Sequence, residues 1–413
     1  MNTQSQIANR KSQILIIGAG PAGASLAIRL ARQNFAVVLI EREKFPRHKL
    51  CGEFVSPECL AHFADLDVLD EMISVGGDRI SQTIFYAPSG KNVTVPSKWF
   101  GASHENALGI SRSEMDFRLL EKAKSVGVEI LEETAVVGLL FESETVCGVK
   151  VKTKTGETVE ISSDLTIDAT GRANVLGKLA DKSFLTQSRK VAKSQKTKDK
   201  RQKTKLVGFK AHLENVNLEK GRCEIYFFRG GYGGLSFVEK GRANHCFLIK
   251  ADVVKKYIGQ TNLLLEEVIF ENKRARETMQ NAKPLFDWLA VSVDGFGRKT
   301  LNPAKNLFTV GDAAAFIDPF TGSGMLMALE SAEILAGLIV ENQFSIQQIA
   351  TQYEILHKKC FDKRLRVCKL MRNAAFVPNL AGILISALNL SSSAREVLAR
   401  ATRRNITAEK IKP

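Results

Sequence analysis

The stretch that decides the fold is ILIIGAGPAGASLAIRLARQNFAVVLIE, which runs from Ile14 to Glu41. Its first four residues, 14–17, are all apolar, which is typical of a strand buried on both faces of a sheet. Residues 24–31 have the composition of a helix, without Gly or Pro. A second apolar run, 36–40, follows the helix. The stretch therefore predicts a strand, a helix and a second strand of an α/β fold.

A glycine-rich turn, Gly18-Ala19-Gly20-Pro21-Ala22-Gly23, joins the first strand to the helix and fits the G-x-G-x-x-G fingerprint. In that fingerprint Gly18 permits the tight turn, Gly20 lets the backbone approach a pyrophosphate, and Gly23 lets the helix pack on the strand. The helix N-terminus offers free N–H groups to the anion, and Glu41 would accept hydrogen bonds from an adenosine ribose. The sequence predicts an ADP-containing dinucleotide here. The alternative is a glycine-rich turn in an ordinary α/β unit.

The net charge of +15 is concentrated in two segments of this 413-residue chain. Residues 181–205 carry ten Lys or Arg against two Asp, and residues 357–372 carry seven against one Asp. The first segment has few apolar residues, so we expect a disordered or frayed insertion. Charge this localised argues against a nucleic-acid binder. The seven Cys and six His show no metal-ligand spacing, so we expect no metal site, and the odd number of Cys without a signal peptide indicates the cytoplasm.

Two further motifs follow the fingerprint along the chain. Residues 168–172 read DATGR after an apolar run, and residues 307–325 read LFTVGDAAAFIDPFTGSGM. In this order and spacing, the three motifs resemble those of FAD-dependent oxidoreductases of the glutathione-reductase-like type. More narrowly, they resemble the group that holds aromatic hydroxylases, geranylgeranyl reductases and flavin-dependent halogenases. The resemblance spans roughly residues 11–340.

The resemblance implies non-covalently bound FAD. It implies that Asp312 holds a ribitol or ribose hydroxyl, and that the helix after residues 319–324 turns its N-terminus to the flavin. It also matches Arg112 to an Arg that contacts FAD. The alternatives are a helix N-cap for Asp312 and an ordinary surface position for Arg112. The full set of expected cofactor-binding residues is Gly18, Gly20, Pro21, Ala22, Gly23, Glu41, Arg42, Arg112, Asp168, Gly171, Gly311, Asp312, Gly322, Gly324 and Met325.

The segment Lys49-Leu50-Cys51-Gly52-Glu53 resembles a segment that lies by the flavin in geranylgeranyl reductases. Cys51 is therefore the candidate catalytic residue, and the alternative is a buried Cys that packs as a small hydrophobe. Residues 231–237 occupy the place of the reductases' Tyr-x-Trp-x-Phe-Pro segment, which lies over the substrate. The Trp and the Pro are missing here. We expect the substrate pocket to include Tyr232, Phe237, Pro319 and Phe320.

The expected architecture is α/β: a Rossmann-like FAD-binding domain with an inserted antiparallel β-sheet substrate domain and a C-terminal helical extension. The FAD-binding domain is assigned to residues 11–75, 111–180 and 301–340, and the substrate domain to residues 76–110 and 206–300. Residues 181–205 form the basic insertion, and residues 341–413 form the C-terminal helical region.

The expected function is an FAD-dependent oxidoreductase that reduces a carbon–carbon double bond of an apolar substrate through reduced flavin. One alternative is a monooxygenase that uses a flavin C4a-hydroperoxide, and another is a non-catalytic flavoprotein that binds a partner. Because no second G-x-G-x-x-G is present, NAD(P)H or a reduced electron carrier would act as a transient reductant. The substrate would be a lipophilic or aromatic small molecule.

The segment 373–394 carries no charged residue and follows the second basic segment. Its Pro, Asn and Ser residues keep the apolar part well below the length of a membrane-spanning helix, about 20 residues. We expect its helices to cap the substrate cavity. The alternative is peripheral contact with an anionic membrane, through a basic helix and an apolar edge.

Overall fold

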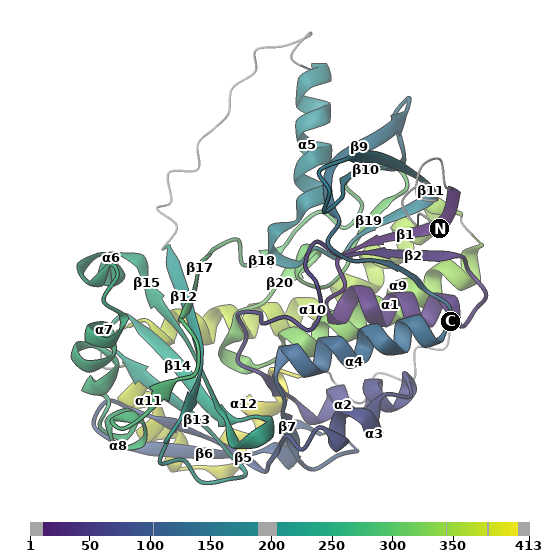
Figure 1. Ribbon diagram of the computed structural model, residues 1–413. Helices are drawn as coiled ribbons and strands as arrows, with labels where there is room; N and C mark the ends of the chain where they lie inside the picture. Colours follow the sequence, from purple (N-terminus) through teal and green to yellow (C-terminus); the bar gives the residue numbers. More distant parts are fainter. Residues whose placement is uncertain (1–10, 102, 189–204, 344, 378–379, 404–413) are drawn as a thin grey trace.

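The computed structural model describes residues 11–101, 103–188, 205–343, 345–377 and 380–403 (Figure 1). Within these residues, seven strands form a first sheet in the order β8-β2-β1-β11-β10-β9, with β19 paired to β11. The strands β8, β2, β1, β11 and β19 are parallel neighbours, whereas β9, β10 and the first half of β11 form an antiparallel meander. Their bounds are β1 Lys11–Ile17, β2 Val37–Ile40, β8 Glu129–Leu131, β9 Ala135–Glu142, β10 Thr145–Lys152, β11 Thr158–Asp168 and β19 Leu307–Thr309.

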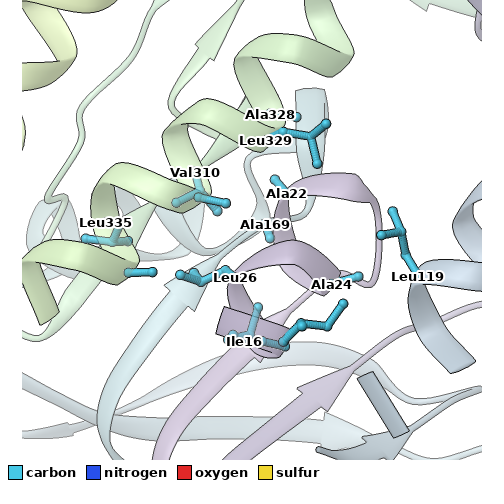
Figure 2. Close-up of a cluster of buried hydrophobic side chains, with 14 of the residues drawn as sticks. Ile16, Ala22, Ala24, Leu26, Leu119, Ala169, Val310, Ala328, Leu329 and Leu335 are labelled. Atoms are coloured by element: carbon cyan, nitrogen blue, oxygen red, sulfur yellow. The ribbon is translucent and has the colours of Figure 1, made fainter. Parts of the chain in front are cut away.

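Three helices cover one face of the parallel strands: α1 (Pro21–Ala31), α4 (Arg112–Ser125) and α9 (Gly324–Asn342). In Figure 2, Ala22, Ala24 and Leu26 of α1 lie between Leu119 of α4 and the α9 side chains Ala328, Leu329 and Leu335. The small alanines let the helix backbones approach closely, and the larger side chains fill the layer between helices and sheet. This packing fixes the turn between β1 and α1, because the same helix is held on both sides.

A second sheet covers the other half of the molecule (Figure 1). The part of the chain that the structure describes gives it eight strands, in the order β16-β12-β15-β14-β13-β5-β6, with β17 also paired to β12. All neighbours are antiparallel except β13 and β5. The bounds are β5 Gln82–Tyr86, β6 Asn92–Pro96, β12 Leu206–Glu214, β13 Arg222–Phe228, β14 Gly231–Phe237, β15 Ala243–Lys250, β16 Lys283–Pro284 and β17 Leu289–Val293.

One face of this second sheet packs on short helices and forms its own core, with Tyr226, Leu235 and Phe247 among the buried side chains. These helices are α6 Ala251–Val254, α7 Thr261–Glu267 and α8 Lys273–Met279. The opposite face is turned toward the first sheet. Smaller elements connect the two halves: α2 Pro57–Asp65, α3 Leu69–Ser74, β3 Phe54–Val55, β4 Asp78–Ile80, β7 Ala107–Gly109, β18 Gly297–Arg298 and β20 Ala315–Phe316.

The last part of the chain is helical, as expected: α10 (Ile346–Ala375), α11 (Leu380–Asn389) and α12 (Ser392–Ala401). The long helix α10 packs against α9 and buries one side, which carries Tyr353, His357, Phe361, Arg364 and Cys368. The helices α11 and α12 continue to β6 at the edge of the second sheet. Among the described residues, no single helix has both the length and the apolar composition of a membrane span. Taken together, α10 and α11 have the length and the apolar composition of a membrane span, but the two helices are bent by 118° relative to each other.

The expected α/β fold with an antiparallel sheet and a helical C-terminal region is confirmed, and one local expectation is wrong. Part of the basic segment 181–205 is not disordered, because α5 (Val175–Ser188) extends through its first eight residues. The buried Asp168 carboxylate stabilises the start of α5 by accepting hydrogen bonds from the backbone N–H groups of Leu176 and Gly177, at 2.8 and 3.2 Å. Residues 189–204 of that segment lie outside the described residues. The division into domains remains a prediction.

Candidate active site

A cavity of about 1270 Å³ lies between the two sheets. The turn after β1 and the loop 47–54 line one end of it. The second sheet contributes Phe85, Val93, Phe227 and Leu248, and the C-terminal helices contribute a further wall. The predicted site residues that line the cavity are Gly18, Gly20, Pro21, Ala22, Glu41, Arg42, Cys51, Arg112, Gly171, Tyr232, Asp312, Pro319, Phe320, Gly322, Gly324 and Met325. The fold therefore brings together residues from six separate stretches of sequence, between residues 18 and 325.

The glycine-rich turn is closed at two of its glycines and open at the third. A Cβ at Gly18, where φ is +106°, would lie 2.5 Å from the carbonyl oxygen of Ala169. A Cβ at Gly23 would lie 1.9 Å from the carbonyl oxygen of Gly18. A Cβ at Gly20 would meet nothing nearer than Arg112 Nη2, at 3.7 Å. Gly20 has an extended backbone (φ −72°, ψ −178°) and lies directly before α1. The open space in front of it is where a pyrophosphate would fit the helix N-terminus.

Glu41 directly follows β2 and lies beside this turn. Its carboxylate accepts hydrogen bonds from the backbone N–H groups of Ala19 (3.0 Å) and Glu43 (3.1 Å), and Arg47 Nη2 lies 3.6 Å away. These contacts hold the buried acid at the cavity wall, in a position that suits a ribose. The neighbouring Arg42 is exposed and pairs with Glu43 at 3.1 Å.

Arg112 is the first residue of α4, and two contacts fix its guanidinium. Its Nε and Nη2 donate to the two carboxylate oxygens of the buried Asp116, both at 2.7 Å. Burial alone would lower the pKa of Arg112, but the Asp116 carboxylate more than offsets it and the pKa is raised. Asp116 also accepts a hydrogen bond from Arg47 Nη1 at 2.8 Å. A rigid cation therefore faces the open space at Gly20.

Asp312 lies in the turn after β19 and is partly exposed to the cavity. Burial raises the pKa of its carboxyl to about 6, although Arg172, Arg112 and Lys299 act in the opposite direction. Among the described residues, none donates a hydrogen bond to this carboxylate. An enclosed carboxylate needs such donors, and the hydroxyls of a sugar or a ribitol chain would supply them. Gly20 and Asp312 therefore both fit FAD.

Four predicted site residues do not line the cavity. Gly23 packs beneath the turn, and Gly311, at φ +59°, lies so close to α1 that a Cβ would be 2.8 Å from Ala22 Cβ. Asp168 is fully buried, where it also accepts hydrogen bonds from Thr170, so it holds the start of α5 and not a ligand. Phe237 lies on the far face of the second sheet. It is five residues from Tyr232 on β14, and side chains at an odd separation along a strand point to opposite faces.

Tyr232 lies on the cavity face of β14. Its hydroxyl donates a hydrogen bond to Asp318 Oδ1, and its ring makes an edge contact with Phe320 at 5.1 Å between centroids. Asp318 Oδ2 in turn lies 3.7 Å from Arg372 Nε of α10. This chain of contacts connects the second sheet, the loop before α9 and the C-terminal helices at one point of the cavity wall.

A buried charge cluster beside the cavity was missed in the sequence. Glu53 accepts hydrogen bonds from the Arg112 backbone N–H (2.7 Å), from His212 Nε2 (2.6 Å) and from Lys210 Nζ. All three side chains of the cluster are almost fully buried. Burial would raise the pKa of Glu53, but Lys210 and His212 more than offset this effect and lower it. Two titratable residues at i and i+2 of a buried strand were the available signal.

Comparisons with known proteins agree with this geometry. Residues 11–342 match the family described as "FAD binding domain". The chain is 26% identical over 354 residues to digeranylgeranylglycerophospholipid reductase 1 of Methanococcoides burtonii, which covers 83% of this chain and 78% of that protein. It is 25% identical over 354 residues to tryptophan 2-halogenase of Chondromyces crocatus, which covers 79% of this chain and 61% of the halogenase.

A solved structure shows the same fold. The geranylgeranyl bacteriochlorophyll reductase-like protein of Thermoplasma acidophilum superposes with a TM-score of 0.75 over 95% of this chain and 96% of that chain, at 19% identity. The family match covers the first sheet, the second sheet and α9, and it agrees with the cavity residues that fit FAD. The chain therefore belongs to the FAD-binding domain family and is an FAD-dependent oxidoreductase.

Proposed function

We propose that this protein reduces a carbon–carbon double bond of an apolar substrate that binds between FAD and the second sheet. The observation that carries the proposal is the apolar cavity wall opposite the glycine-rich turn, made by Phe85, Val93, Ile225, Phe227 and Leu248. The similarity to the reductase supports it, since the alignment covers 78% of that protein but 61% of the halogenase.

Four groups of residues would hold FAD without a covalent link. The turn at Gly20 and the N-terminus of α1 would bind the pyrophosphate, and Glu41 would accept hydrogen bonds from the adenosine ribose. Asp312 would accept hydrogen bonds from the ribitol chain, and Gly324 at the start of α9 would face the flavin ring. Bound FAD, once reduced by NAD(P)H or a carrier, supplies a hydride to one carbon of the double bond.

The second carbon needs a proton, and Cys51 is the residue that we assign to deliver it. Its thiol lines the cavity and faces the Arg112 guanidinium. A thiol at the cavity wall can act as a general acid toward that carbon and regain its proton from solvent. Tyr232, held by Asp318, and Phe320 would shape the substrate's position at the same wall.

The test uses FAD-loaded protein that has been reduced under anaerobic conditions. Addition of a polyunsaturated isoprenoid should restore the absorbance of oxidised flavin and yield a product heavier by two hydrogens, whereas the saturated analogue should leave the flavin reduced. The similarity to the halogenase favours an oxygen-dependent reaction as the second candidate. Flavin that reoxidises only with oxygen, together with an oxygenated or halogenated product, would establish that candidate and exclude the reductase.

We also propose that α10 brings the cavity to an anionic membrane surface. Lys359, Lys363, Arg366 and Leu370 follow one another at intervals of four, three and four residues, so they share one face of the helix. All four are exposed. Leu370 is 70% exposed and also lines the cavity. A basic face that ends in an apolar side chain at the cavity opening suits lipid headgroups and a lipophilic substrate.

A further inference from the structure

The loop that carries Cys51 is held in place by the second sheet. Residues 41–53 lie between β2 and β3 and form neither helix nor strand. Lys210 Nζ of β12 donates a hydrogen bond to the carbonyl oxygen of Lys49 at 3.0 Å. Asn244 Nδ2 of β15 donates one to the carbonyl oxygen of Cys51 at 3.1 Å. Both donor residues are at most 1% exposed. The position of the thiol therefore depends on buried side chains from the other half of the molecule.

Glu53, at the end of this loop, has a backbone conformation that its residue type rarely adopts. Its φ is +54°, in the left-handed region, where a Cβ is unfavourable. In this conformation the backbone N–H of Glu53 donates a hydrogen bond to Cys51 Sγ at 3.4 Å. Such strain persists only where the surrounding structure holds it, and it is concentrated at functional sites. The strained residue is thus in direct contact with the thiol that we assign to proton delivery.

The carboxylate of Glu53 holds this conformation. Its Oε1 accepts hydrogen bonds from Lys210 Nζ and from the backbone N–H of Arg112, and its Oε2 accepts one from His212 Nε2 at 2.6 Å. Lys210 and His212 are two residues apart on β12, so they project from the same face of that strand. The desolvation of buried charges offsets much of their mutual attraction. Stability alone therefore does not account for this cluster.

We infer that Glu53 is a positioning residue for Cys51, and that Lys210 and His212 set its place from the second sheet. When the thiol acts as general acid, its S–H bond breaks, a C–H bond forms on the substrate and the electron pair stays on sulfur. The backbone N–H of Glu53 already faces that sulfur, and a donor fixed in advance stabilises the charge that develops there. The inference rests on the proposed function, since it takes Cys51 to deliver the proton.

Two substitutions at His212 test the inference. His212→Leu removes the donor to Glu53 Oε2, whereas His212→Gln keeps one, because a side-chain amide N–H can take the place of Nε2–H. Tyr226→Phe is the matched control. It removes one hydrogen bond, of 2.8 Å, from another buried carboxylate of the second sheet, Glu224, in the core away from the cavity. If His212→Leu does not fold, Glu53→Gln combined with Lys210→Met takes its place, since that double variant leaves no buried charge unpaired.

The first measurement is the rate at which a polyunsaturated isoprenoid reoxidises the reduced, FAD-loaded protein without oxygen. His212→Leu should slow this reaction by about tenfold to a hundredfold, because misplacing a reacting group by about 1 Å costs up to about a hundredfold. The isoprenoid concentration that gives half the maximal rate should not change, since His212 does not line the cavity. His212→Gln should restore most of the rate, and Tyr226→Phe should react as the wild-type protein does.

The same comparison in a Cys51→Ala background separates positioning from a general structural effect. If the cluster acts through the thiol, His212→Leu should cause no further loss of rate once the thiol is absent, because residues that act as a unit are not additive. Amide hydrogen exchange of residues 49–53, followed by mass spectrometry, reports the loop directly and needs no turnover. Exchange should be faster in His212→Leu than in the wild-type protein, in His212→Gln and in Tyr226→Phe.

The outcomes distinguish this inference from the proposed function. A rate that does not fall in His212→Leu, or that falls equally with and without the thiol, would overturn the inference. Wild-type reduced flavin that does not react with the isoprenoid would overturn the proposed function, and hydrogen exchange would then decide the positioning role. Unchanged exchange of residues 49–53 in His212→Leu would overturn that role as well. A loss of rate that requires Cys51 and is restored by His212→Gln supports it.

Discussion

Gly20 and Arg112 face each other across an open space, and a Cβ on Gly20 would lie 3.7 Å from Arg112 Nη2. The helix N-terminus behind Gly20 and the guanidinium in front of it both favour a negatively charged group between them. Arg112 cannot move into this space, because Asp116 holds its Nε and Nη2. The arrangement is therefore a preformed anion site whose size depends on the absence of a side chain at residue 20.

Gly20→Val should abolish FAD binding and leave the fold intact. The backbone at residue 20 is extended, so valine meets no conformational strain there. Its side chain would instead occupy the place of the pyrophosphate. FAD content of the purified protein and its circular dichroism test this prediction. Gly337→Ala in α9, where a Cβ meets nothing nearer than 3.8 Å, is the control. Full FAD occupancy in Gly20→Val would rule out the assigned pyrophosphate site.

FAD affinity should fall as the pH is lowered through about 6, the pKa of Asp312 without its ligand. Burial raises that pKa, so the carboxyl is protonated below this pH and ionised above it. Hydroxyl donors of FAD favour the ionised form, so FAD binding releases a proton and its affinity is fully present only above about pH 6. Titrations with FAD from about pH 5 to about pH 8 measure the effect. Asp312→Asn should bind FAD more weakly at high pH and show no such dependence; a dependence that persists would assign it to another group.

Glu53→Gln should destabilise the protein by about 3–5 kcal/mol, because it leaves the buried Lys210 without its counter-ion. The pKa of Glu53 is lowered, so its contribution to stability is present above the ordinary value of 4.5 and is lost as the pH falls below it. Urea unfolding is measured for Glu53→Gln, for Lys210→Met and for the double variant. The three free energies of unfolding give the coupling energy between the two side chains. The double variant should lose less unfolding free energy than the two single variants lose in sum. Additive costs would show that the pair is not coupled.

Cys51→Ala should slow proton delivery to the substrate without loss of FAD. The thiol lines the cavity, whereas Cys59, the control, is fully buried and burial raises its pKa to about 12. Single-turnover reoxidation of reduced flavin by an unsaturated substrate should fall by about 10²–10⁴, the usual contribution of a general acid. The solvent deuterium isotope effect should change with it. An unaltered rate and isotope effect in Cys51→Ala would leave the thiol with a packing role.

The protein should sediment with vesicles that contain anionic lipid and be released by high salt. Replacing Lys359, Lys363 and Arg366 by Gln should weaken the binding by about 1 kcal/mol for each residue. Arg364 lies in the same basic segment of α10, but it is buried and pairs with Glu330, so it cannot contact lipid headgroups. Replacing the exposed Lys152 and Lys154, which lie on the meander of the first sheet, should have little effect. Equal sedimentation with neutral and anionic vesicles would contradict the role of the basic face.

The sequence predicts those parts of the site whose residues are close together in the chain and form one local motif. Gly18, Gly20 and Gly23 follow a short fingerprint, and the chain places them where that fingerprint requires. Lys210 and His212 at i and i+2 of a strand hint at a polar cluster, but their contact with Glu53 could not be predicted, because it joins residues up to 159 positions apart and depends on how the second sheet docks. Phe237 shows a different limit. The sequence predicts the strand that contains it, but which face of that strand reaches the cavity depends on how the strand pairs within the second sheet.

Motifs also failed to separate a ligand-binding acid from a structural one. Asp168 is the last residue of β11 and Asp312 lies three residues after β19, and each precedes a turn that contains glycine or alanine. The four hydrogen bonds to Asp168 come from backbone N–H groups and a hydroxyl of its own neighbourhood, so its carboxylate is satisfied within the chain. Asp312 has no such donor among the described residues. The distinction lies in the path of the chain after each strand, which composition does not encode.

The position of α12 at the cavity has a consequence for the order in which the protein is made. Every residue that would hold FAD lies between Gly18 and Met325, whereas α11 and α12 complete the cavity with residues that leave the ribosome later. A nascent chain can therefore accept the cofactor while the substrate chamber is still open to solvent. When α12 docks, Arg403, two residues beyond its end, donates a hydrogen bond to the carbonyl oxygen of Thr321, so closing the chamber also fixes the loop before α9.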